Sequence, residues 1–294
     1  MRVPGAVDPA WRDEVGELPY RIACKALGVR AGAHRSRGAG TGGPFRDLAP
    51  FLASPDPRRI DLSRSLRDPF EALHVRRFEN TASLDIVLLA DVSGSMAFNG
   101  TSNKLATIAA LADVLARSAR RIGDRFGFMA ADGAVRENLT YALTRARGSE
   151  DAMLSALLEF QPDRTGWEGL VEAANELTGR NKLVILVSDF YLPESALKNL
   201  FEGLQRHHVI PILLSDTRAA EDLPRWGLVT FEDLETGKRR TVLMRPSYKA
   251  AIVAGDKERK AKLRAMTAGY GWEPFEIEGR IDWPAFGARL AGGR

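Results

Sequence analysis

Apolar positions between residues 84 and 216 fall into short continuous runs that alternate with longer periodic segments. A short continuous run is typical of a parallel strand that is buried on both faces. Such runs lie at residues 84–90, 182–188 and 209–216. Segments with apolar residues at helical spacing lie at residues 103–123, 149–160, 166–179 and 193–207. The alternation predicts an α/β fold, Rossmann-like and doubly wound, with a mainly parallel sheet and right-handed crossovers.

The segment before residue 81 lacks this regularity. An amphipathic helix is expected around residues 19–29, followed by a Gly- and Arg-rich stretch at residues 32–45 that is typical of a loop or irregular extended chain. A proline-punctuated segment follows, and residues 72–80 alternate well enough to form a strand. We predict that residues 1–80 wrap over another surface instead of forming a core of their own.

The segment after residue 236 is also distinct. A hairpin is expected to turn near residues 235–237, followed by a basic helix at residues 256–271, a strand at 272–278 and a last helix at 282–293. We therefore divide the chain into an N-terminal wrapping segment (1–80), a central α/β domain (81–236) and a C-terminal α/β extension (237–294) packed on the central domain.

Composition and the apolar pattern indicate the cellular compartment. The single cysteine, Cys24, excludes an intramolecular disulfide framework and fits a reducing compartment. The N-terminal 20 residues have no apolar core of signal-peptide length, and no window holds the roughly 18 apolar residues that a membrane span needs. These features predict a cytoplasmic protein with no membrane span.

Charge is distributed unevenly over the three segments. Counting Lys and Arg against Asp and Glu gives +4 for residues 1–80, −7 for residues 81–236 and +7 for residues 237–294. Opposite charges in one chain can neutralise each other, so we expect the basic flanks to fold back on the acidic centre. Binding of nucleic acid or of acidic protein surfaces is the alternative.

Polar side chains gather where two of the buried strands end. Asp91 follows the first apolar run, and Asp189 follows the second. Ligands of an open parallel sheet bind beyond the carboxyl ends of its strands, so the two carboxylates are expected at one edge. Ser93 and Ser95 lie on the turn after the first strand, and Thr165 precedes a helix.

These five side chains offer oxygen atoms only. An all-oxygen set without Cys or His favours Mg²⁺, with Mn²⁺ or Ca²⁺ as alternatives, over zinc or copper. Each part also has a structural interpretation. The residues from Asp91 to Ser95 fit a turn and helix cap, and Thr165 with Glu168 fits a capping box. The three parts in this order along the chain are a more specific signal of a metal site than any one part alone.

At this point the chain resembles a known family of domains. DVSGSM (91–96), DRTGWEGL (163–170) and VILVSDF (184–190) resemble the metal-ion-dependent adhesion site of von Willebrand factor A domains. The resemblance covers residues 83–216 and implies that Ser93, Ser95 and Thr165 contact the ion, while Asp91 and Asp189 sit mostly behind bridging waters. An open coordination position would then accept a carboxylate from a partner protein. Partner contacts are predicted at the neighbouring Trp167, Met96 and Phe190.

A narrower resemblance extends toward the N-terminus. Residues 34–69 and 73–96 are similar to the bacterial domain-of-unknown-function family 58, with two departures. Leu62 stands where that family usually has tryptophan, and ASPDP (53–57) replaces a glycine-aspartate turn. The resemblance implies a MoxR-type AAA+ ATPase as partner, in chaperone-like assembly or maturation of an unknown client protein.

Two other classes of function were weighed against a protein-interaction module. A metal-dependent hydrolase needs a base or proton donor, and all four histidines fall outside the motif loops. Nucleic-acid binding would use the basic flanks, which carry few aromatic residues for stacking. We therefore expect a binding protein without catalytic residues, in which nucleic acid plays no part.

Overall fold

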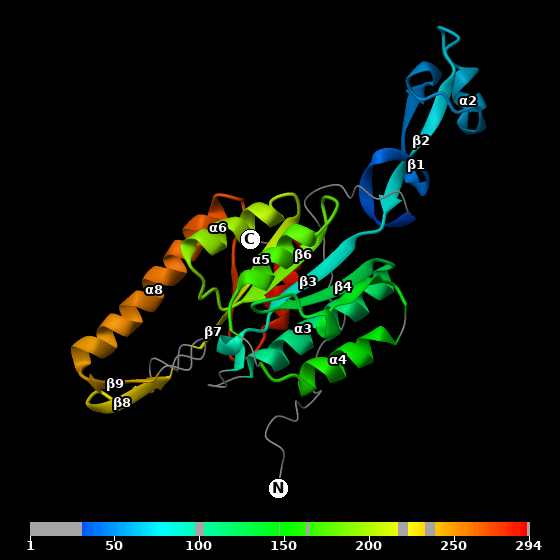
Figure 1. Cartoon of the computed structure of the whole chain (residues 1–294). Coiled ribbons are helices and arrows are strands. Elements are labelled where there is room, and N and C mark those ends of the chain that lie inside the picture. The colour runs from blue at the N-terminus through cyan, green and yellow to red at the C-terminus, as the bar shows by residue number, and fades with distance from the viewer. Residues whose placement is uncertain are drawn as a thin grey trace.

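A mainly parallel sheet lies at the centre of the chain (Figure 1). The computed structural model describes residues 31–97, 103–146, 148–162, 165–216, 223–232 and 239–292. Within these residues six strands form the sheet, in the order β10-β7-β6-β3-β4-β5, and only β5 is antiparallel to its neighbour. The strands are β3 (Asp85–Asp91), β4 (Arg125–Ala131), β5 (Tyr141–Thr144), β6 (Leu183–Ser188), β7 (His208–Ser215) and β10 (Phe275–Glu278). The mixed α/β class predicted from the sequence is confirmed.

Different helices cover the two faces of this sheet. Leu88 and Ile185 belong to one apolar cluster, whereas Leu89 and Leu186 belong to the other. Successive side chains of a strand point to opposite faces, so a continuous apolar run buries both. The first cluster includes side chains of α3 (Lys104–Ile122), α4 (Ser149–Glu159) and α9 (Trp283–Leu290). The second includes side chains of α5 (Glu168–Glu176), α6 (Glu194–Leu204) and α8 (Pro246–Ala268).

The direction of strand addition reverses at the centre of the sheet. After β3 the chain adds β4 on one side, and it later adds β6 on the other side of β3. The carboxyl ends of β3 and β6 therefore lie next to each other at a topological switch point. This is the place in an open α/β sheet where a ligand site is expected.

The N-terminal segment, predicted to wrap over another surface, forms in its described part a hairpin arm that projects from the body (Figure 1). The arm pairs β1 (Ala31–Pro50) with β2 (His74–Ala82), and between them lie η1 (Phe51–Ala53), η2 (Pro57–Arg59) and α2 (Leu62–Ser65). The Gly-rich stretch, for which a loop or an irregular extended chain was expected, is extended and belongs to β1, whose pairing contains several register shifts. Bulges of this kind keep a glycine-rich chain within a ladder. The helix expected at residues 19–29 lies outside the described residues.

The C-terminal segment joins the body at the edge of the sheet. Its strand β10 pairs with β7, and its helix α8 contributes Leu263 to an apolar cluster of the body. The predicted hairpin is present as β8 (Gly227–Glu232) and β9 (Arg239–Met244), although its turn lies outside the described residues. None of the helices in the described part of the chain combines the length and the apolar character that crossing a bilayer requires.

Candidate metal centre

The switch point brings the predicted site residues into one pocket. Asp91, Ser93, Ser95, Thr165 and Asp189 all line a cavity of about 340 Å³. Strands β3 and β6 are parallel neighbours, with Ala90 opposite Val187, so the residues that follow emerge at the same edge. Each strand is rigid because it is buried and paired on both sides. The pocket therefore has a fixed floor, to which the loops add the hydroxyl groups.

Asp91 is held by hydrogen bonds to both of its carboxylate oxygens. The Ser93 amide donates to Oδ1 over 3.0 Å, and the Ser188 hydroxyl donates to Oδ2 over 2.6 Å. Burial and the negative charge of Asp189 raise the pKa of Asp91 to about 6, against the hydrogen bonds from Ser188 and Ser93, which favour the ionised form. A cation in the pocket would pair with the ionised carboxylate and so offset the free-energy cost of ionising Asp91 in a buried site.

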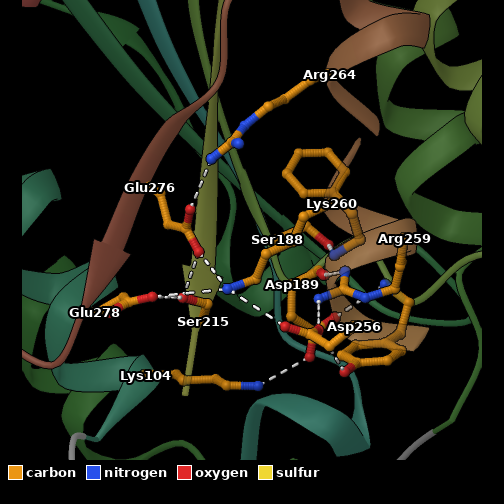
Figure 2. A network of polar contacts seen from close by, with 12 residues as sticks. Lys104, Ser188, Asp189, Ser215, Asp256, Arg259, Lys260, Arg264, Glu276 and Glu278 are labelled. Carbon is orange, nitrogen blue, oxygen red and sulfur yellow. Dashed lines mark hydrogen bonds and ion pairs between the residues drawn. The ribbon is translucent and has the colours of Figure 1, made fainter. Parts of the chain in front are cut away.

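Asp189 already has a cationic neighbour. The Nζ of Lys104, in the first turn of α3, lies 2.9 Å from Asp189 Oδ2 (Figure 2). It also donates to the Ser95 carbonyl over 3.1 Å. The other oxygen of Asp189 accepts the Tyr191 amide over 3.3 Å. Two carboxylates and one ammonium leave the site one net negative charge when both carboxylates are ionised.

The hydroxyl groups are placed by the two loops. Ser93 Oγ and Ser95 Oγ lie 3.2 Å apart. The capping box, which was the alternative interpretation of Thr165, does not form, because the N-cap of α5 is Trp167 and Glu168 Oε2 accepts the Trp167 amide over 3.0 Å. The Thr165 loop lies against the turn after β4, where a Cβ on Gly133 would come within 2.5 Å of the Thr165 carbonyl oxygen. A glycine at position 133 is therefore what allows the loop to approach.

The three residues predicted to contact a partner lie in different environments. Trp167 is half-buried and lines the pocket. Met96 and Phe190 are fully buried instead, because Met96 joins the apolar cluster under α3 and Phe190 packs near Phe201 on the opposite face. The aromatic side chain on the rim of the pocket is that of Tyr191, which is 63% exposed.

Several residues that shape the site were missed by sequence reasoning. Lys104 lies 85 residues from Asp189 in the chain, and Ser188 lies 97 residues from Asp91. Arg259 of α8 donates from Nη1 to the Asp189 carbonyl over 2.7 Å. A serine directly before the aspartate of a strand end is a weak local signal, and nothing in the sequence couples Lys104 or Arg259 to the motif. These contacts depend on which helices border the switch point.

The donor set fits a hard divalent cation. The pocket offers two buried carboxylates and three hydroxyls, and none of its lining residues is Cys or His. In the described part of the chain, no group of three or more His, Cys, Asp and Glu side chains is placed to hold a metal ion, and the pocket itself combines two carboxylates with hydroxyls. Ser93, Ser95 and Thr165, with Asp91 and Asp189, are thus the residues that would hold a cation here.

The chain matches a known protein family over most of its length. The family profile described as "Protein of unknown function DUF58" matches residues 51–262, and the chain belongs to this family. An uncharacterized protein in the moxR 3' region of Paracoccus denitrificans is 38% identical over 104 residues, which is 35% of this chain and 99% of that protein. The uncharacterized protein Rv1480 of Mycobacterium tuberculosis is 26% identical over 98% of this chain and 90% of its own length.

Solved structures give a more distant likeness. The conserved hypothetical protein BatB from Bacteroides thetaiotaomicron aligns with 72% of this chain and all of its own, at 14% identity and a TM-score of 0.41. An aerotolerance-related membrane protein from Bacteroides fragilis aligns with 71% of this chain and 96% of its own, at 13% identity and a TM-score of 0.42.

Proposed function

We propose that this protein is a metal-dependent protein-interaction module of the von Willebrand factor A type. In this proposal Mg²⁺, or Mn²⁺ or Ca²⁺ in its place, binds at the switch point through the five oxygen-bearing residues. A carboxylate of a partner protein then binds at the remaining coordination position. The observation that carries the proposal is the pocket itself, because side chains from three separate loops converge in it.

The electrostatics of the pocket support a role for an external anion. Lys104 already neutralises part of Asp189, so a bound divalent cation would keep net positive charge in a site with one net negative charge of its own. Neutral hydroxyls reduce this charge little, which leaves an attraction for a carboxylate from outside. Trp167 and Tyr191 on the pocket lining would supply the apolar surround that strengthens such a contact.

The partner we propose is a MoxR-type AAA+ ATPase, with this protein as its adaptor or co-chaperone for a client. The support is the relative from Paracoccus denitrificans, which is described by its place in the moxR 3' region. A binding role is favoured over hydrolysis by the contacts of the candidate bases. Both carboxylate oxygens of Asp91 already accept hydrogen bonds, from the Ser93 amide and the Ser188 hydroxyl, and the Lys104 ammonium is paired with Asp189.

A binding experiment tests both parts of the proposal. The purified full chain is titrated calorimetrically with MgCl₂ and MnCl₂, and its association with the MoxR-type ATPase of the same organism is measured in Mg²⁺ and in EDTA. The test variant is Ser93→Ala/Ser95→Ala. The matched control is Ser63→Ala/Ser155→Ala, because both of these serines are exposed and neither lines the pocket.

We expect wild type and control to bind the metal, and to bind the ATPase only when the metal is present. The Ser93→Ala/Ser95→Ala variant should lose both properties while keeping its circular dichroism spectrum. Metal binding that survives loss of both serines would overturn the assignment of the site. An ATPase complex that forms equally well in EDTA would overturn the metal-bridged interaction.

A further inference from the structure

The turn that carries Asp189 has an unusual backbone. Phe190 adopts a positive φ of 54°, a left-handed conformation that a bulky residue rarely occupies. Its side chain is fully buried near Phe201, and its amide donates to the Ser188 hydroxyl over 2.9 Å. Such a conformation persists only where the surroundings hold it in place. The peptide that joins Asp189 to Phe190 is therefore the point at which the direction of the Asp189 carboxylate is decided.

Helix α8 contacts this same peptide. Arg259 donates from Nη1 to the Asp189 carbonyl over 2.7 Å, and its guanidinium carbon lies 3.9 Å from the ring centroid of Tyr191 (Figure 2). Asp256, one turn earlier on the helix, accepts from Nη2 over 2.8 Å. The guanidinium is thus held by a carboxylate, an aromatic ring and the carbonyl of the strained peptide. Arg259 contacts both Asp189 and Tyr191, which line the pocket.

The helix that presents Arg259 is itself anchored on the body. Leu263, one turn further along the same face, is buried in the apolar cluster that contains Phe190. Lys262 lies 2.6 Å from Glu194 at the start of α6, and Lys260 pairs with Glu276 of β10. These contacts fix the position of α8 against the turn, so its arginine is presented from a rigid element and not from a loop.

We propose that Arg259 of α8 is a positioning residue of the candidate metal site, which it shapes by holding the Asp189–Phe190 peptide and the Tyr191 ring. The inference rests on the proposed function for the identity of the ligand, and on the contacts above for the role of the helix. It makes the C-terminal extension a part of the site. Loss of a residue that orients a metal ligand commonly lowers metal affinity about 10- to 100-fold.

The test compares two arginines of the same helix. In Arg259→Ala the contact with the turn is lost, whereas in the control Arg264→Ala only an exposed pair with Glu276 is lost. Mn²⁺ affinity is measured calorimetrically, and hydrogen exchange at the amides of Phe190 and Tyr191 is measured in metal-free protein. Arg259→Lys keeps the charge but not the planar group that stacks on Tyr191.

We expect Arg259→Ala to bind Mn²⁺ at least about 10-fold more weakly and to exchange both amides faster, with Arg259→Lys between it and wild type. Arg264→Ala should match wild type within about twofold. Unchanged affinity and unchanged exchange in Arg259→Ala would overturn the positioning role. If wild type itself binds no Mn²⁺, the proposed function fails, and exchange in the metal-free proteins still decides the role of Arg259. Should Arg259→Ala not fold, Asp256→Ala, which removes one of the three groups that hold the guanidinium, is measured in its place.

Discussion

The central sheet and the hairpin arm use the same kinds of apolar residue in opposite environments. Leu88 of β3 is completely buried, whereas Leu66 after α2 is 85% exposed and Phe70 is 90% exposed. Polar contacts differ as well. The arm pairs residues that are close along its own hairpin, such as Asp61 with Arg76, while the site joins Lys104 to Asp189 across 85 residues.

The two regions are therefore stabilised by different interactions. The body is held by apolar burial on both faces of a sheet, which fixes the strand ends and hence the pocket. The arm is held mainly by its ladder and by local ion pairs such as that between Asp47 and Arg77. A rigid site is therefore expected only in the body, and substitutions in the two regions should differ in cost.

The largest expected effect is on the free energy of unfolding, when the same Leu→Ala substitution is made once in the body and once in the arm. Leu88→Ala removes a side chain from the core and should lower the free energy of unfolding by about 4 kcal/mol. Leu66→Ala, at the exposed position on the arm, should change it by no more than about 0.5 kcal/mol. Urea unfolding of both variants measures the difference. Equal losses would mean that the arm also has a buried core, which would remove the contrast.

A second test concerns the charge pair inside the pocket. Lys104→Met leaves the buried Asp189 carboxylate without its cation and should lower the free energy of unfolding of the metal-free protein by about 3 kcal/mol. Addition of Mg²⁺ should stabilise this variant more than it stabilises wild type. The metal-free variant has two carboxylates without a cation, whereas in wild type Lys104 already pairs with Asp189. Thermal melts with and without MgCl₂ measure both effects. Lys198→Met, which breaks an exposed pair with Glu194, is the control, and a similar loss there would contradict the role of burial.

The smallest predicted effect is a gain in the free energy of unfolding, on substitution of Asp91. Asp91 has a folded-state pKa of about 6, above its usual 3.8, so protonation favours the folded state. This stabilisation is fully present below pH 3.8 and is lost as the pH rises through 6. Asp91→Asn removes the cost of the ionised group and should raise the free energy of unfolding of the metal-free protein at pH 7.5 by about 2 kcal/mol. The gain stays below the about 3 kcal/mol equivalent of the pKa shift because the amide nitrogen cannot accept a hydrogen bond.

Urea unfolding of wild type and Asp91→Asn at several pH values checks this prediction. The stability difference between them should shrink as the pH falls from 7.5 to 5, and the variant should no longer bind Mg²⁺. A variant that is less stable than wild type at pH 7.5 would show that Asp91 is stabilising even without a cation.

The α/β class and the set of oxygen-bearing residues can be read from the amino-acid sequence alone. Short, continuously apolar runs are typical of strands buried on both faces, and parallel neighbours present their carboxyl ends at one edge. Asp91 and Asp189 therefore line one pocket, as expected, although they are far apart in the chain. The hydroxyls of Ser93 and Ser95 follow directly, because they lie on the turn that leaves the first strand.

The surroundings of these residues depend instead on how distant segments of the chain pack together. Met96 and Phe190 directly follow the site residues Ser95 and Asp189 in sequence, yet neither lines the pocket, because the turns that carry them direct their side chains into the two apolar clusters. The contacts of Lys104 and Arg259 depend on helix packing, which brings remote segments within hydrogen-bonding distance. The hairpin arm likewise projects because its ladder and ion pairs form within the arm and not with the body. No local sequence pattern specifies that these residues pair with one another.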